Sequence, residues 1–225
     1  MIKLIAFDID DTLTKEPRTV PQANLDAVKR AQDAGIFVTV ATGRGFHGSS
    51  YIWQAMGVQG PIINYGGAVI NDTVTGKALY TTELDPRMVK ELLALAKELN
   101  VHAHIYQGDG IVFAEEKLIT MLGKRYEGKL KVSGSVPGFV EFNAENAHKG
   151  SALEWVANYL GIERGETAAV GDNLLDLEMI QYAGIGAAVA NAHPQILSAA
   201  NVVLPRCEDM AAAWFIDNII LKGMK

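Results

Sequence analysis

The sequence predicts an α/β fold, a doubly wound parallel sheet into which a small α+β module is inserted. The first observation is a series of short apolar segments that end abruptly at polar residues, as Ile2–Phe7 does at Asp8. Such segments are typical of strands buried on both faces. The second is the presence of helical segments between them, because strand, helix and strand in this rhythm form parallel βαβ units. The third is a middle third in which polar and apolar residues alternate, as in an antiparallel sheet with one wet face.

The first and last thirds of the chain supply the predicted parallel sheet. In the first third we expect strands at 2–7, 36–41 and 61–63 and a helix at 21–34, which has Pro21 at its start and Gly35 past its end. In the last third we expect helices and strands in alternation: helices at 149–160, 174–182, 194–200 and 210–221, and strands at 167–170, 186–190 and 202–204.

The middle third predicts one strong helix at 84–99, surrounded by short strands. Those strands are expected at 69–71, 78–82, 102–106, 111–114, 131–135 and 139–143. We therefore expect residues 1–80 and 146–225 to form the core, and residues 81–145 to form the inserted α+β module.

Composition excludes several classes of protein. The chain has 225 residues, of which 49% are hydrophobic and 20% charged, as in ordinary globular proteins. Its net charge of −6 argues against binding to nucleic acid or to an anionic membrane. The single cysteine excludes an internal disulfide and, with an N-terminus unlike a signal peptide, leads us to expect a cytoplasmic protein.

Acidic and hydroxyl residues directly follow three of the predicted strands. Asp8 and Asp10 come after the first strand, Thr42 after the second and Asp172 after a strand of the last third. Because ligands in an open α/β sheet bind beyond the carboxyl ends of the strands, we expect these side chains to gather at one edge. Asp176 faces the same place if a helix begins there. A single aspartate at a strand end is often only a turn residue, so the inference depends on the whole set.

This set of residues indicates phosphoryl transfer. Several carboxylates cannot all stay ionised in a partly dehydrated crevice unless a positive charge compensates them. Oxygen ligands without histidine or cysteine favour a hard cation such as Mg²⁺, which substrate phosphate usually helps to coordinate. Thr42, the backbone N–H groups after it, and Lys149 could donate hydrogen bonds to that phosphate. Catalysis of this kind is mainly positioning and charge neutralisation.

Four segments resemble, in chain order, the motifs of the haloacid dehalogenase (HAD) superfamily of phosphohydrolases, in the form of its Cof-like subclass IIB. The segments are Phe7–Leu13 (FDIDDTL), Val40–Arg44 (VATGR), Lys149–Leu153 (KGSAL) and Gly171–Met179 (GDNLLDLEM). The resemblance implies a Rossmann-like core with an α/β cap between the second and third motifs. The cap is short for this branch and looks closer to the compact caps of phosphoglycolate phosphatase-like members.

The resemblance also implies roles for individual residues. Asp8 would be the nucleophile and Asp10 the general acid and base. Mg²⁺ would be bound by Asp8, Asp10, Asp172 and Asp176, with Asp10 contributing its backbone carbonyl. The phosphate would be bound by Thr12, Thr42, Gly43, Arg44 and Lys149. Further residues could contact the substrate, namely Phe46 and His47 after the second motif and His102, His104 and Tyr106 in the cap.

Two positions depart from the pattern of this branch. Leu175 stands where the branch usually has asparagine before the second acid of the fourth motif, and Gly66 stands where it has the asparagine of NGA. Both changes remove an amide close to the expected site and could widen the pocket.

We therefore expect a Mg²⁺-dependent phosphatase that acts on a small phosphorylated metabolite, such as a sugar phosphate or a phosphoglycolate-like acid. One alternative is a phosphomutase of the same superfamily. Another is a catalytically weak module that binds a phosphate ligand, which Leu175 and Gly66 would favour. Exposed apolar surface on a small cap could support a homodimer.

Overall fold

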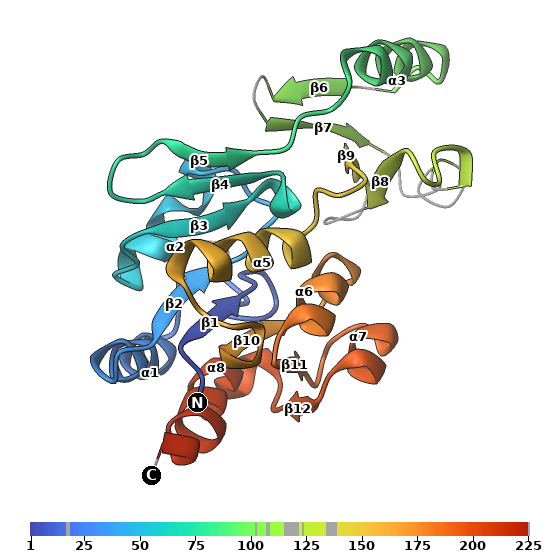
Figure 1. Cartoon of the computed structure of the whole chain (residues 1–225). Coiled ribbons are helices and arrows are strands. Elements are labelled where there is room, and N and C mark those ends of the chain that lie inside the picture. Colours follow the sequence, from blue (N-terminus) through green and yellow to red (C-terminus); the bar gives the residue numbers. More distant parts are fainter. Residues whose placement is uncertain are drawn as a thin grey trace.

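The computed structural model describes residues 1–16, 19–101, 103–106, 109–114, 122, 124–133 and 139–224 (Figure 1). Three sheets follow one another through the molecule. A parallel sheet with its helices lies at the bottom of the view, a three-stranded antiparallel sheet lies above it, and a four-stranded antiparallel sheet with a long helix lies at the top.

Five parallel strands form the centre of the core, in the order β12-β11-β10-β1-β2. Their bounds are Leu4–Phe7 (β1), Phe37–Val40 (β2), Thr167–Gly171 (β10), Ile185–Val189 (β11) and Val202–Leu204 (β12). The sheet grows outward from β1 to β2 on one side and from β10 to β12 on the other. The order in which strands are added therefore reverses between β1 and β10. Open α/β sheets bind their ligands at such a switch point.

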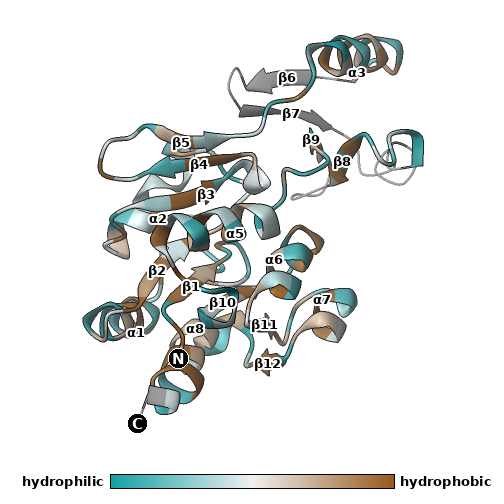
Figure 2. Cartoon of the chain, viewed as in Figure 1, coloured by the Kyte–Doolittle hydropathy of each residue, from teal (hydrophilic) through white to brown (hydrophobic). Residues whose placement is uncertain are grey.

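Six helices accompany this sheet, and their bounds are Gln22–Asp33 (α1), Ser50–Ala55 (α2), Lys149–Leu160 (α5), Leu177–Tyr182 (α6), Pro194–Ala199 (α7) and Ala211–Phe215 (α8). Helix α1 packs against α8, whereas α5 packs against α6 and α6 against α7. Figure 2 shows brown, hydrophobic stretches along the core strands and mixed colours on the helices. Burying these apolar faces joins strands and helices in one hydrophobic cluster.

A second sheet extends the core on the β2 side. It is antiparallel and comprises β3 (Pro61–Asn64), β4 (Val69–Asp72) and β5 (Ala78–Thr81). Strand β3 runs parallel to the end of β2, with a bridge between Ala41 and Ile63 and a hydrogen bond of 2.9 Å from the Thr42 N–H to the Ile63 carbonyl. The loop that follows β3 is thereby held beside the loop that follows β2.

The third sheet lies in the segment expected to be inserted. Its strands are antiparallel in the order β6-β7-β9-β8. Their bounds are Ala103–Tyr106 (β6), Asp109–Ala114 (β7), Leu130–Ser133 (β8) and Phe139–Ala144 (β9), and the helix of this segment is Pro86–Glu98 (α3). Helix α3 shares a separate hydrophobic cluster with this segment, formed by Leu92, Leu95, Ala96, Leu122, Tyr126, Leu130 and Phe142. We call residues 81–145 the cap module.

The predicted fold class, an α/β core with a parallel sheet and an α+β cap, is confirmed. Three details differ. The strand expected at 69–71 pairs with β3 and the strand expected at 78–82 pairs with it in turn, so both belong to a second sheet beside the parallel one. The helix expected at 174–182 begins with a 3₁₀ turn over Leu174–Asp176, and the helix expected at 210–221 continues from α8 into a π turn over Ile216–Ile220. Among the described residues, no helix is long and apolar enough to cross a membrane.

Candidate active site

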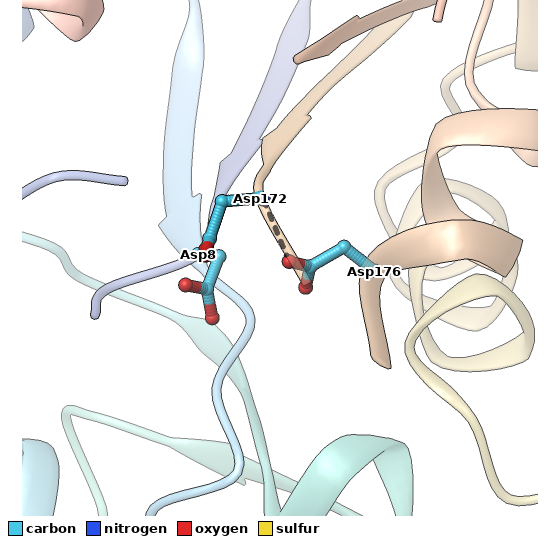
Figure 3. A group of neighbouring side chains, drawn as sticks. All are labelled: Asp8, Asp172 and Asp176. Atoms are coloured by element: carbon cyan, nitrogen blue, oxygen red, sulfur yellow. Dashed lines mark hydrogen bonds between the residues drawn. The ribbon is translucent and has the colours of Figure 1, made fainter. Parts of the chain in front are cut away.

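Asp8 and Asp172 lie side by side after the carboxyl ends of β1 and β10, the two strands between which the strand order reverses. Strands β1 and β10 are in register, with Phe7 opposite Val170, and the Asp8 N–H donates a hydrogen bond of 2.9 Å to the Val170 carbonyl. The chain leaves both strands one or two residues later, so both carboxylates emerge at the same sheet edge. Figure 3 shows Asp8 and Asp172 next to each other, with Asp176 beside them at the start of the helix region.

The three carboxylates form a compact acidic cluster. Asp8, Asp172 and Asp176 each offer an oxygen, and these oxygens all lie within 4.8 Å of one another. Burial raises the pKa of Asp8 well above its usual range, although the Lys149 ammonium opposes this shift. Burial, followed by the negative charge of Asp176, raises the pKa of Asp172 to about 7. Three close carboxylates of this kind can hold a hard divalent cation, which would remove their mutual repulsion.

Lys149 supplies the positive charge within the cluster. Its Nζ lies 2.6 Å from Asp8 Oδ1 and 2.5 Å from Asp176 Oδ1, and its side chain is 2% exposed. Burial lowers the pKa of Lys149, but the charges of Asp176 and Asp8 outweigh it and the pKa is raised. Lys149 is therefore held as a cation and links the first, third and fourth motifs.

The position of Lys149 follows from how α5 begins and packs. His148 is the N-cap residue, and its Nδ1 accepts a hydrogen bond of 3.1 Å from the Ser151 N–H. A Cβ at Gly150 would lie 2.6 Å from the Glu178 carbonyl oxygen. Only glycine therefore lets α5 approach α6 this closely, and that approach brings Lys149 to Asp176.

Asp176 organises the loop that follows β10. Its Oδ2 accepts hydrogen bonds of 3.0 Å from the N–H groups of both Asp172 and Asn173. A Cβ at Gly171 would lie 2.5 Å from Asp176 Cβ and Cγ, so the carboxylate folds back over a residue without a side chain. With Lys149 on its other oxygen, Asp176 is held by three hydrogen bonds and orients the backbone at Asp172.

Thr12 ties the first motif to the fourth. Its Oγ1 donates a hydrogen bond of 2.9 Å to Asp172 Oδ1. Asn191 holds the same loop from outside, because its Nδ2 donates to the Asp11 carbonyl at 3.2 Å while its Oδ1 accepts from the Cys207 N–H at 2.9 Å. Thr12 was expected to bind phosphate, and here it contacts the acidic cluster.

The residues of the second motif lie in the loop that follows β2. Thr42 is buried, its Oγ1 accepts a hydrogen bond of 3.1 Å from the Arg44 N–H, and its carbonyl accepts one of 3.0 Å from the Gly66 N–H. Arg44 was expected to bind phosphate, but its Nε donates to Asp10 Oδ2 at 2.9 Å and forms an ion pair with this carboxylate. The Asp10 side chain of this pair is 57% exposed, and that of Arg44 is 21% exposed.

A sequence model of the haloacid dehalogenase-like hydrolases matches residues 5–127 and 114–216. The chain belongs to this family.

Curated relatives of this hydrolase are phosphatases. Phosphatase YwpJ of Bacillus subtilis is 29% identical over 286 residues, covering 97% of this chain and all of the relative. The 5-amino-6-(5-phospho-D-ribitylamino)uracil phosphatase YitU of the same organism is 26% identical over 260 residues, covering 95% and 96%. These relatives confirm the expected enzyme class, a phosphoric monoester hydrolase. The alignment with YwpJ is longer than this chain, so the relative carries segments that the hydrolase lacks.

Solved structures show the same fold. A haloacid dehalogenase-like hydrolase from B. subtilis superimposes with a TM-score of 0.86 at 25% identity, covering 97% of this chain and 100% of that one. The HAD subclass IIB sugar phosphatase BT4131 also gives a TM-score of 0.86, at 18% identity, covering 96% and 98%. The resemblance of the motifs to a HAD Cof-like phosphatase is confirmed by the family model and the curated phosphatases, and these structures show the shared fold.

The two departures from the motif pattern lie next to each other. A Cβ at Gly66 would lie 4.0 Å from Leu175 Cδ2 and 3.2 Å from Asn143 Nδ2. Asn143 comes from β9 and donates a weak hydrogen bond of 3.4 Å to the Tyr65 carbonyl. An amide from the cap module thus lies beside position 66, where Gly66 provides none. Asn143 was missed in the sequence, because nothing in β9 distinguishes it from any polar residue at the end of a strand.

Gly67 is a further residue that the sequence left without a role. Its φ is +107°, and a Cβ there would lie 2.3 Å from the His148 carbonyl carbon and 2.7 Å from the Lys149 nitrogen. The loop after β3 therefore packs directly on the start of α5. The pair Gly66-Gly67 was the available signal, since adjacent glycines often mark close backbone approach.

The expected substrate contacts have different surroundings. The Phe46 ring stacks on Trp53 with ring centroids 5.3 Å apart, which is a packing role, and His47 is exposed. His104 and Tyr106 lie in β6, but their side chains, and His102 altogether, fall outside the described residues. Their contact with substrate stays a prediction.

Proposed function

We propose that this hydrolase is a Mg²⁺-dependent phosphatase that releases phosphate from a small phosphorylated metabolite through an aspartyl-phosphate on Asp8. The observation that carries the proposal is the buried Asp8 carboxylate, held by Lys149 and placed within the acidic cluster at the sheet edge. A nucleophile needs this kind of fixed position close to positive charge when it attacks an anionic phosphate.

The residues around Asp8 suit this chemistry. An Asp8 oxygen would attack phosphorus, and the bond from phosphorus to the leaving oxygen would break. Lys149, whose ammonium already contacts Asp8, would neutralise the equatorial phosphate oxygens together with N–H groups that follow Thr42. Asp8, Asp172 and the backbone carbonyl of Asp10 would hold Mg²⁺, with Asp176 orienting them. When bound, Mg²⁺ supplies positive charge that favours approach of the phosphate to the carboxylates.

Asp10 would move the proton. An alkoxide leaving group needs a proton, and Asp10 would donate it to the leaving oxygen. The resulting carboxylate would then take a proton from the water that attacks the phosphorus, which returns Asp8 to its free form. In this structure Arg44 pairs with Asp10. Arg44 would have to release Asp10 during the reaction, so we assign Arg44 to positioning Asp10 as well as to phosphate.

The substrate would be small. The relative YitU is named for a substrate with a phosphorylated ribityl chain, and a sugar phosphate or a short phospho-acid would suit the same chemistry here. The cap module would cover the site during phosphoryl transfer and open for release. Gly66 and Leu175 themselves carry no amide, so the amide beside position 66 comes from Asn143 of the cap module.

The deciding measurement is phosphate release from p-nitrophenyl phosphate with Mg²⁺ and with EDTA, for wild type and Asp8→Asn. We expect release by the wild type with Mg²⁺, and its loss by at least about 10³-fold in Asp8→Asn or with EDTA. Undiminished release by Asp8→Asn would refute the assignment of the nucleophile. If neither protein releases phosphate, a panel of phosphorylated metabolites distinguishes a selective cap from a module that only binds phosphate.

A further inference from the structure

One ion pair joins the cap module directly to the helix of the fourth motif. Lys131 in β8 contacts the Glu178 carboxylate in α6. In Figure 1, β8 and β9 lie on the same side of the core as α5 and α6. Both side chains are about three-quarters buried, with 27% of Lys131 and 25% of Glu178 exposed. Ion pairs shielded to this degree are less screened by salt than those on the open surface.

A second contact lies on the same face of the cap sheet. Lys131 and Asn143 are directly opposite each other in the pairing of β8 with β9, so their side chains project to the same side. Asn143 reaches the Tyr65 carbonyl in the loop after β3, while Lys131 reaches Glu178. One face of the cap sheet therefore contacts both the loop after β3 and helix α6.

The two contacts differ in strength. The Asn143 contact is a neutral hydrogen bond at the long distance of 3.4 Å, whereas the Lys131 contact is charged. Glu178 Oε2 is buried and has no hydrogen-bond partner among the described atoms. Loss of Lys131 would therefore leave a largely buried carboxylate without its counter-charge, and this part of the interface would be weakened.

We infer that Lys131 and Glu178 form a latch that holds the cap module over the active site, and that Lys131 is a positioning residue for substrate binding. The inference rests on the proposed phosphatase function for its consequence in turnover, but not for the latch itself. The latch acts on α6, the helix that begins directly after Asp176. Closing the cap module and fixing this end of the site are thus the same event.

The kinetic test compares Lys131→Met, Glu178→Gln and the reversed pair Lys131→Glu/Glu178→Lys. When the closed state is less populated, the apparent affinity for substrate falls by the same fraction. We expect KM to rise about fivefold in each single variant while kcat stays within about twofold, and the reversed pair to recover most of the loss. Lys3→Met is the control, because it removes a lysine from an ion pair with Glu166 whose two partners both lie outside the cap module.

The structural test needs no activity. Spin labels at Lys97→Cys on α3 and Ser198→Cys on α7 report the distance between cap module and core by pulsed electron paramagnetic resonance. Both positions are exposed, and the single native cysteine, Cys207, is 2% exposed and should escape labelling. We expect Lys131→Met to broaden the distance distribution, the reversed pair to narrow it again and Lys3→Met to leave it unchanged.

The outcomes separate the two proposals. A distance distribution in Lys131→Met that matches the wild type overturns the latch, whatever the kinetics show. A broadened distribution in a protein that releases no phosphate supports the latch and refutes the phosphatase. Raised KM without recovery in the reversed pair also overturns the latch, because a role that depends on charge pairing must survive the exchange.

Discussion

At the scale of single residues, close backbone approach accounts for much of the candidate site. Lys149 reaches both aspartates because Gly150 lets α5 approach α6, and Asp176 turns back because Gly171 leaves room for its carboxylate. Gly67 lets the loop after β3 pack against the backbone of His148, the residue before Lys149. These glycines carry no chemistry, yet the charged groups could not meet without them.

Gly67→Ala tests this interpretation. Its Cβ would overlap the His148 backbone at a distance of 2.3 Å, and its φ of +107° is unfavourable for alanine. We expect the free energy of unfolding to fall by about 3 kcal/mol or more. Gly161→Ala is the control, since Gly161 also has a positive φ but open space around it, and it should cost about 1 kcal/mol. Equal losses in urea denaturation would show that the loop does not pack on α5 as described.

At the scale of elements, the start of α5 depends on a titratable residue. His148 accepts the Ser151 N–H through Nδ1, which only a neutral imidazole can do. Burial lowers the pKa of His148 below its ordinary value of 6.5, while Glu178, Lys131 and Glu154 act on it with opposing charges. The element that positions Lys149 should therefore loosen in acid.

His148→Asn tests this pH dependence. The unfolded chain takes up a proton near pH 6.5 and the folded protein only at lower pH, so this contribution is present above 6.5 and is lost as pH falls below it. Asparagine keeps an acceptor for the Ser151 N–H but does not titrate in this range. We expect the loss of stability between about pH 8 and pH 5.5 to be smaller in His148→Asn than in wild type. An identical pH profile in urea denaturation would contradict the role of His148.

At the scale of the whole molecule, stability and function compete at the sheet edge. The fold gathers three carboxylates, two of which contact Lys149, and burial together with their mutual repulsion raises the pKa values of Asp8 and Asp172. The folded state of Asp172 titrates at about 7, against 3.8 in a model peptide, so its ionisation destabilises the fold increasingly between these values. A bound cation would relieve this cost.

The effect of Asp172→Asn on thermal stability should therefore depend on whether Mg²⁺ is present. Without divalent cations at about pH 8, we expect the variant to unfold at a higher temperature than wild type, because the repelled charge is gone. With excess Mg²⁺, the unfolding temperature of wild type should rise with the ratio of the Mg²⁺ concentration to the dissociation constant for Mg²⁺. The unfolding temperature of Asp172→Asn should rise little. Asp33→Asn, which changes an exposed carboxylate on α1, should respond to Mg²⁺ as wild type does. Equal thermal shifts in Asp172→Asn and wild type would place the cation elsewhere.

Much of the fold could be predicted because the local signals were strong. The apolar segment before Asp8 and the limits of α5 at Lys149–Leu160 agree between sequence and structure. Alternation at 69–71 and 78–82 predicts antiparallel strands but does not identify a further partner strand. That partner is β3, which pairs with β4 and lies parallel to the end of β2.

The sequence by itself determined which residues could react. Local patterns mark the carboxylates and the hydroxyl group that follow strands and the lysine that begins a helix. Parallel strands then carry all their carboxyl ends to one edge of the sheet. The tertiary structure decided how those residues are used. It paired Asp176 with Lys149, paired Arg44 with Asp10 and brought Asn143 beside Gly66. These contacts join segments far apart in the chain, and their partners are fixed by close packing of helices and loops, which leaves no periodic trace in a single sequence.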